Sequence, residues 1–143
     1  MVTEVMHTHL RHEGGYKFNI TFDEMGGRLH SDEPKPLGRE EGFTAEMLLN
    51  SAVGHCLTSS LVFCMEKSRV PVKDVEADLV TTLKRNEKGR WRVDAIKVNL
   101  RVNVDDKDKD KFERCRGMFQ DFCIVSTSIR EGVKIDVEAE LMQ

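Results

Sequence analysis

Cysteine is the residue type in this 143-residue sequence with the most obvious chemical potential, and no two of its four cysteines form a Cys-x-x-Cys pair. The spacing therefore supports neither a zinc ribbon nor a thioredoxin-type motif. Cys56 lies in a run without Asp, Glu, Lys or Arg between Glu46 and Glu66, in a chain that is 33% charged. Cys123 lies just ahead of a predicted helix start, where the helix dipole favours a thiolate. These two thiols are the candidates for chemistry; the alternative is that a buried thiol is inert.

The uncharged run predicts a long helix from Thr44 to Lys67, with Thr44 as N-cap. A helix with one face exposed to solvent would have polar residues along that face, and this segment has small residues instead. We therefore expect the helix to be buried on almost all sides. Glu46 precedes Cys56 by ten residues, which is about 15 Å along a helix axis, so the two side chains cannot touch. Glu46 could still line the mouth of a pocket that holds the thiol. Polar residues within the run and the lack of an aromatic belt argue against a membrane span.

Composition narrows the class of protein. The net charge of −3 and the pI near 6.0 give no electrostatic argument for binding nucleic acid. The N-terminal residues show no signal peptide, and four cysteines without an export signal predict a reducing compartment, the cytoplasm. His7, His9 and His12 lack Cys or carboxylate partners at ligand spacing, so we expect no metal and no cofactor. We treat residues 1–143 as one domain.

Alternating apolar residues predict a series of strands around that helix. Those before the helix form an antiparallel meander, and those after it form a long hairpin that turns at 86–89 and has a bulge where the apolar phase of the return strand shifts. The predicted strands are Val2–Leu10, Tyr16–Phe22, Arg28–Ser31, the strand that begins near Val75, Arg90–Val104 and Val133–Leu141.

Two further helices are expected between the hairpin and the last strand. The charged run Asp105–Lys111 begins the first, and the second has its N-cap at Ser126 and stops at Gly132. The order β-β-β-α-β-β-α-α-β indicates an α+β fold with antiparallel sheets around the long helix. Because one meander and one hairpin cannot cover an apolar helix on every side, we predict a two-fold homodimer with this helix buried at its centre.

Two segments resemble a known family. GFTAEMLLNSAVGHCLTSSL is similar to the central-helix motif of the osmotically inducible protein C and organic hydroperoxide resistance (OsmC/Ohr) superfamily. FCIVSTSI resembles the second cysteine motif of that family, with Ile124 where proline is usual. The resemblance implies an intertwined α+β homodimer with active sites at the subunit interface. It also implies thiol-dependent reduction of organic, alkyl or lipid, hydroperoxides.

The resemblance also implies roles for single residues. Cys56 takes the part of the peroxidatic cysteine and Cys123 that of the resolving cysteine. Glu46 takes the part of a carboxylate that pairs with an active-site arginine, for which Arg39 is the first candidate and Arg28 the second. Such an arginine lowers the thiol pKa and stabilises the developing alkoxide. Cys56 would become a sulfenic acid and then a disulfide with Cys123, which an external thiol or dithiol must reduce.

Two other interpretations stay open. A non-catalytic dimer of the same fold could bind a small apolar ligand in its interface pocket, with Cys56 as a packing residue. In the other interpretation the protein is a purely structural dimer. We expect Cys64 and Cys115 to be inert core residues, because buried apolar cysteines are usually unreactive.

Overall fold

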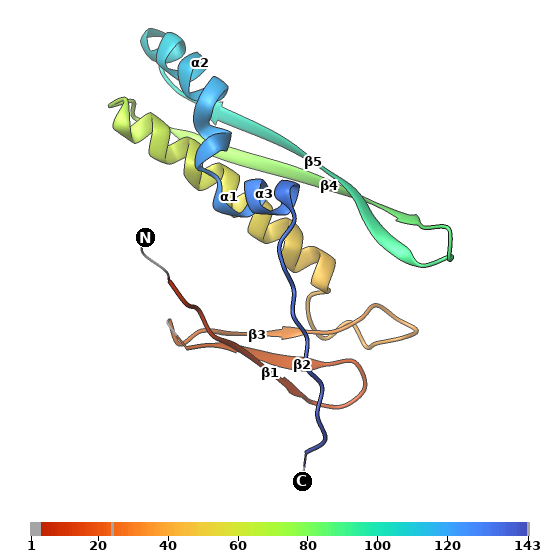
Figure 1. The fold of residues 1–143 in the computed structure, drawn as a ribbon. Coiled ribbons are helices and arrows are strands. Elements are labelled where there is room, and N and C mark those ends of the chain that lie inside the picture. Colours follow the sequence, from red (N-terminus) through yellow and green to blue (C-terminus); the bar gives the residue numbers. More distant parts are fainter. Residues whose placement is uncertain (1–3, 24, 143) are drawn as a thin grey trace. The chain divides into compact units, whose positions relative to one another are not determined.

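The computed structural model describes residues 4–23 and 25–142, and they form two compact units, one up to Leu49 and the other from Asn50. Figure 1 shows their helices and strands. The element classes confirm the predicted mixture of helices and antiparallel sheets.

The first unit is built on an antiparallel meander in the order β1-β2-β3. Its strands are β1 (Thr8–His12), β2 (Phe18–Phe22) and β3 (Arg28–Ser31). Gly14 and Gly15 both have positive φ in the first turn, as their lack of a side chain allows. The first strand was predicted from Val2, but Val2 and Thr3 lie outside the described residues. It begins only at Thr8 because its partner strand ends at Phe22.

The central helix α1 (Ala45–Lys67) confirms the predicted helix, and its first turns belong to the first unit. The backbone N–H of Met47 donates to Thr44 Oγ1 at 3.2 Å, so Thr44 is the N-cap. By length and composition α1 could cross a membrane, but core helices of soluble proteins pass the same test, and 33% of its most apolar window is buried. The absence of a membrane span stays a prediction.

In the second unit α1 packs on the hairpin of β4 (Asp74–Arg85) and β5 (Trp91–Asn103). A Cβ at Gly54 would lie 2.8 Å from Leu79 of β4, so glycine allows the helix to approach the strand closely. The hydroxyl of Thr81 also donates to the Asn50 side chain. The predicted bulge is confirmed, since Thr82 pairs with Ala95 and the next residue pairs with Val93.

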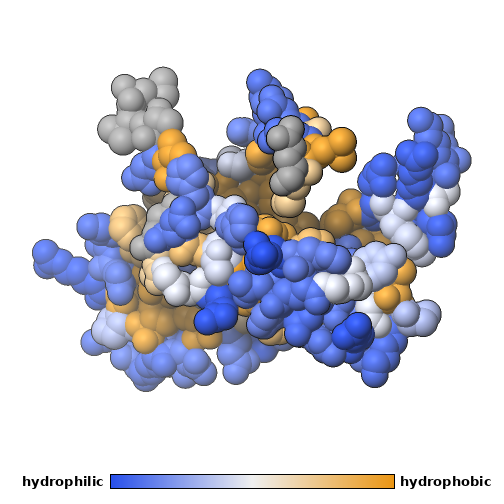
Figure 2. Space-filling model, turned by 90° about the horizontal axis from the view of Figure 1, so that it is seen from below, coloured by the Kyte–Doolittle hydropathy of each residue, from blue (hydrophilic) through white to orange (hydrophobic). Residues whose placement is uncertain are grey.

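Only one face of α1 is covered within the second unit. A stripe at helical spacing is buried there: Val53, Gly54, Leu57, Ser60, Leu61, Cys64 and Met65. The opposite face is exposed, at Ser51, Ala52, His55, Ser59 and Phe63. The single chain leaves this face uncovered, and its burial by a second subunit stays a prediction. Apolar side chains also reach the surface in the space-filling view (Figure 2).

Short helices follow the hairpin. They are the 3-10 turn η1 (Asp106–Asp108), α2 (Lys109–Met118), the 3-10 turn η2 (Phe119–Phe122) and α3 (Ile124–Glu131). Gly132, at φ 87°, ends α3 as predicted. The predicted N-cap at Ser126 is wrong, because α3 begins earlier and Cys123 caps it.

The predicted last strand, Val133–Leu141, is also wrong for the single chain. The described residues after Gly132 pair with no strand and are exposed. A strand forms only where a neighbour supplies partners for its backbone N–H and C=O groups, and alternating apolar residues do not supply one.

Candidate functional site

The structure brings Cys56 of α1 and Cys123 together, and these are the two free cysteines. Their thiols are hydrogen-bonded to each other. The backbone N–H of Val125, in the first turn of α3, donates to Cys56 Sγ at 3.4 Å. The two thiols named from the sequence therefore form one site at the start of α3.

Cys123 has an extended backbone, with φ −80° and ψ 106°, and its sulfur accepts the N–H of Ser126 at 3.4 Å. The thiol thus does what a serine or aspartate oxygen does at other helix N-termini. This contact holds the sulfur at the positive end of the α3 dipole, where negative charge is favoured.

The pKa values of the two thiols are shifted in opposite directions. Burial raises the pKa of the Cys56 thiol, its hydrogen bond with Cys123 raises it further, and the N–H groups of Val125 and Ile124 only partly oppose this. Burial also acts to raise the pKa of Cys123, but hydrogen bonds from Ser126 and Cys56 outweigh it and lower that pKa. Within the second unit, therefore, Cys123 loses its proton more readily than Cys56.

Ile124 stands where the related motif has proline, and this difference has a chemical consequence. Its backbone N–H helps to lower the pKa of Cys56, and proline has no N–H to donate. We expect Ile124→Pro to raise the pKa of Cys56, because the first position of a helix accepts the proline ring and only the donor is lost. The rate of alkylation by iodoacetamide as a function of pH, in a Cys123→Ser background, measures this. Ile124→Ala, which keeps the N–H, is the matched control; equal profiles for the two variants would contradict the role of that donor.

The loop that carries Arg39 is organised around the buried Asp32 carboxylate of the first unit. Its oxygens accept the N–H groups of Glu33 at 2.8 Å, Arg39 at 3.2 Å and Glu41 at 3.1 Å. Burial acts to raise the pKa of Asp32, but these three bonds and the charge of Arg39 outweigh it and lower that pKa. The backbone of Arg39 is thereby fixed.

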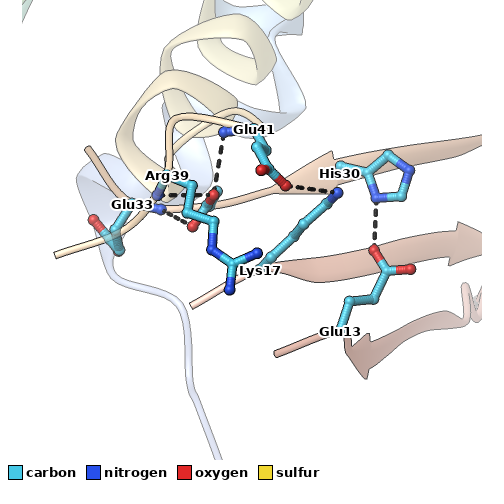
Figure 3. Close-up of polar contacts among 7 residues, drawn as sticks. Glu13, Lys17, His30, Glu33, Arg39 and Glu41 are labelled. Atoms are coloured by element: carbon cyan, nitrogen blue, oxygen red, sulfur yellow. Dashed lines mark hydrogen bonds and ion pairs between the residues drawn. The ribbon is translucent and has the colours of Figure 1, made fainter. Parts of the chain in front are cut away.

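The guanidinium of Arg39 remains available to other groups. The side chain is exposed, and it forms no ion pair with a carboxylate of the described residues. Neighbouring charges are paired instead, with Lys17 Nζ 3.1 Å from Glu41 and His30 Nδ1 2.9 Å from Glu13 (Figure 3).

Glu46 lies in the first turn of α1 and is also exposed. It forms no ion pair with Arg39 within the described residues. Arg28 begins β3. These three charged residues belong to the first unit and the two thiols to the second, so their roles toward Cys56 stay predictions.

A cavity of about 250 Å³ lies between α1, β5 and α3 in the second unit. Its walls are mostly apolar, and Ser126, which donates to Cys123, borders it. Leu57 of α1 lines this cavity. Sequence analysis missed the contributions of α3 and β5: Val93, Asp94, Ala95, Ile96, Val98, Ile129 and Arg130.

The structure corrects the expectation for the other two cysteines. Cys64 and Cys115 are buried, as expected, but they form a disulfide with their Cα atoms 5.7 Å apart. They are therefore not independent core thiols. One signal in the sequence pointed to this pairing, because Cys64 follows Cys56 by the same eight residues by which Cys115 precedes Cys123.

Among residues 4–23 and 25–142, no group of three or more His, Cys, Asp or Glu side chains could hold a metal ion. The expectation that the protein uses no metal or cofactor stays a prediction.

Comparison with known proteins identifies relatives of this chain. The sequence model of the family described as OsmC-like protein matches residues 38–138. No protein with a curated functional description matches significantly. An OsmC-like protein of unknown function from Vibrio cholerae has a similar structure, with a TM-score of 0.76 and 16% identity over 88% of this chain and 94% of that one.

Two further solved structures carry more specific names. An organic hydroperoxide resistance protein OsmC from Legionella pneumophila has a TM-score of 0.71 and 14% identity, over 91% of this chain and 92% of that one. The organic hydroperoxide resistance protein OhrB of Bacillus subtilis has a TM-score of 0.61 and 22% identity, over 89% and 91%. At these identities the likeness establishes the fold.

Proposed function

Because the chain belongs to the OsmC-like protein family, we propose that it is a thiol-dependent peroxidase that reduces organic hydroperoxides through Cys56 and Cys123. The observation that carries the proposal is the contact between the two free thiols at the start of α3. Relatives named as organic hydroperoxide resistance proteins share the fold and support the same conclusion.

The greater exposure of Cys56 supports its role in the first step. Cys123 is only 1% exposed, whereas Cys56 is half-buried, so a peroxide reaches Cys56 first. The hydrogen bond between the thiols gives the proton of Cys56 a path to the Cys123 sulfur. The lowered pKa of Cys123 therefore fits it to act as the base as Cys56 attacks.

The reaction balances with these two sulfurs and one external reductant. Cys56 passes its proton to Cys123 and attacks the terminal oxygen of ROOH, the O–O bond breaks, and the products are a Cys56 sulfenic acid and RO⁻, which takes a proton from water to become ROH. The Cys123 thiol then attacks the sulfenic sulfur, which releases water and forms a disulfide. A dithiol supplies two electrons and two protons to restore both thiols. The apolar cavity beside Ser126 suits an alkyl or lipid group of the substrate.

Arg39 is proposed as the cation that shifts negative charge to Cys56 and stabilises the leaving alkoxide. We expect Arg39→Ala to lower kcat/KM for cumene hydroperoxide by about 10²- to 10³-fold, as for the loss of one donor to a developing oxyanion. Steady-state assays with dithiothreitol as reductant measure this. Arg28→Ala is the matched control and should change kcat/KM little; the reverse pattern would assign the role to Arg28.

We also propose that the functional form is a homodimer, as the exposed face of α1 suggests, because its residues from Ser51 to Phe63 include no Asp, Glu, Lys or Arg. The apolar residues of the C-terminal segment are exposed too: Val133, Ile135, Val137 and Leu141. A second copy could cover both surfaces and supply strand partners for that segment. Sedimentation at micromolar concentration tests this, and a monomer under those conditions would overturn it.

The peroxidase proposal is tested by mixing reduced protein with equimolar cumene hydroperoxide, followed by intact mass and peptide mapping. We expect the loss of two hydrogens with a Cys56–Cys123 crosslink, which Cys56→Ser should lack. Mapping separates this crosslink from the Cys64–Cys115 disulfide. If the two thiols remain unchanged in folded protein, the proposal fails, and the cavity beside Ser126 would instead favour a non-catalytic protein that binds a small apolar ligand.

A further inference from the structure

The Cys64–Cys115 disulfide lies one fixed interval from the thiol site on both segments that build it. On α1 it follows Cys56 by eight residues, and on the other segment it precedes Cys123 by eight residues. The two cysteine pairs therefore connect α1 to the segment 115–123 at two points, and the two segments run in opposite directions. We call Cys56 and Cys123 the inner pair and Cys64 and Cys115 the outer pair.

Other contacts follow the same antiparallel order. Ser68 Oγ lies 3.7 Å from Cys115 Sγ near the end of α1. The rings of Phe63 and Phe122 lie 6.5 Å apart between their centroids. All of these are non-covalent and weak, so the outer disulfide is the strongest connection between α1 and the segment that carries Cys123.

The outer pair does not exchange directly with the inner pair. Eight helical residues span about 12 Å, which is too far for one sulfur to attack another. The outer pair can therefore affect the inner pair only by changing the relative positions of the two inner thiols. A covalent link eight residues before Cys123 restricts where that residue can move relative to α1, and this raises the effective concentration of one inner thiol at the other.

We propose that the Cys64–Cys115 disulfide is a positioning pair that sets the redox equilibrium of Cys56 and Cys123. With the outer disulfide formed, the inner thiols are held together and their disulfide resists reduction. With the outer pair reduced, α2 and η2 can move away from α1, and the inner disulfide is reduced more easily. Oxidation of either pair transfers two electrons and two protons to a disulfide such as oxidised glutathione, which becomes two glutathione thiols.

The test measures the inner equilibrium in glutathione buffers, with differential alkylation and peptide mapping. We expect Cys64→Ala/Cys115→Ala to lower the equilibrium constant for forming the inner disulfide about tenfold, by loss of effective concentration. That change moves its reduction potential to a value less negative by about 30 mV. Val70→Ala, which removes a buried side chain without a sulfur, is the control for a general loss of stability and should leave the potential unchanged.

A reciprocal measurement keeps the proposal falsifiable if the double variant does not fold. Linkage requires the inner pair to favour the outer disulfide by the same factor, so Cys56→Ser/Cys123→Ser should make the outer disulfide about tenfold easier to reduce. The proposal is overturned if the inner disulfide of Cys64→Ala/Cys115→Ala has the same reduction potential as in the wild type. It is also overturned if the reduction potential of the outer disulfide is unchanged in Cys56→Ser/Cys123→Ser. The inference rests on the pairing of Cys56 with Cys123 and not on peroxidase turnover. If the protein were inactive toward hydroperoxides, the proposed function would be wrong, but the coupling between the inner and outer pairs could still be measured.

Discussion

Replacement of Cys56 by serine is expected to lower kcat/KM for cumene hydroperoxide by at least about 10³-fold, as for the loss of an attacking nucleophile. A serine hydroxyl at this position keeps the size of the side chain but is a far weaker nucleophile than sulfur. Because Cys56 is half-buried at the edge of the packed face of α1, the fold should persist. Consumption of the hydroperoxide with dithiothreitol as reductant, together with circular dichroism of the variant, measures both expectations.

Cys123→Ser is the matched variant, because it removes the second step and spares the first. A single equivalent of hydroperoxide should still be consumed, and Cys56 should then be trapped as a sulfenic acid by dimedone. The pKa of Cys56 should fall in this variant, because the hydrogen bond and the charge of Cys123 that raise it are lost. If Cys123→Ser were inert in the first turnover and Cys56→Ser were oxidised, the two roles would have to be exchanged.

Loss of the Cys64–Cys115 disulfide is expected to lower the free energy of unfolding by about 4 kcal/mol. The disulfide joins residues separated by 51 positions, and closing a loop of that size removes about this much chain entropy from the unfolded state. Urea unfolding of Cys56→Ser/Cys123→Ser, with and without prior reduction, measures the difference without interference from the inner pair.

The control is the quadruple variant that also carries Cys64→Ala and Cys115→Ala, whose stability should be the same in both conditions. A reduced protein as stable as the oxidised one would show that the disulfide constrains the unfolded chain little. The chain-entropy account would then be wrong for this protein.

Local patterns in the sequence determined most of the elements. The uncharged run fixed α1, since its length, its N-cap at Thr44 and its end before Pro71 are all local properties. The hairpin and its bulge were also predictable, because a shift in apolar phase has to appear as an extra residue in one strand. The pairing of Cys56 with Cys123 came from the family resemblance, and the structure places the two thiols in contact.

Only the tertiary structure decided the features that depend on partners distant in the chain. The Cys64–Cys115 disulfide requires α2 to lie against the end of α1, and no local pattern encodes that approach. The alternating residues of Val133–Leu141 predict a strand, yet the single chain provides no neighbour to pair with it.

The pKa values of the two thiols also combine a local effect with effects that depend on the tertiary structure. The sequence placed Cys123 near a helix start, which favours a thiolate by a local dipole. The structure showed that Cys123 itself caps α3 and accepts the Ser126 N–H, while burial and the Cys123 sulfur raise the pKa of Cys56. Periodicity, caps and turns act over a few residues and can be inferred from the sequence. Burial, charge and covalent pairing depend on which residues fold together, and the structure had to supply them.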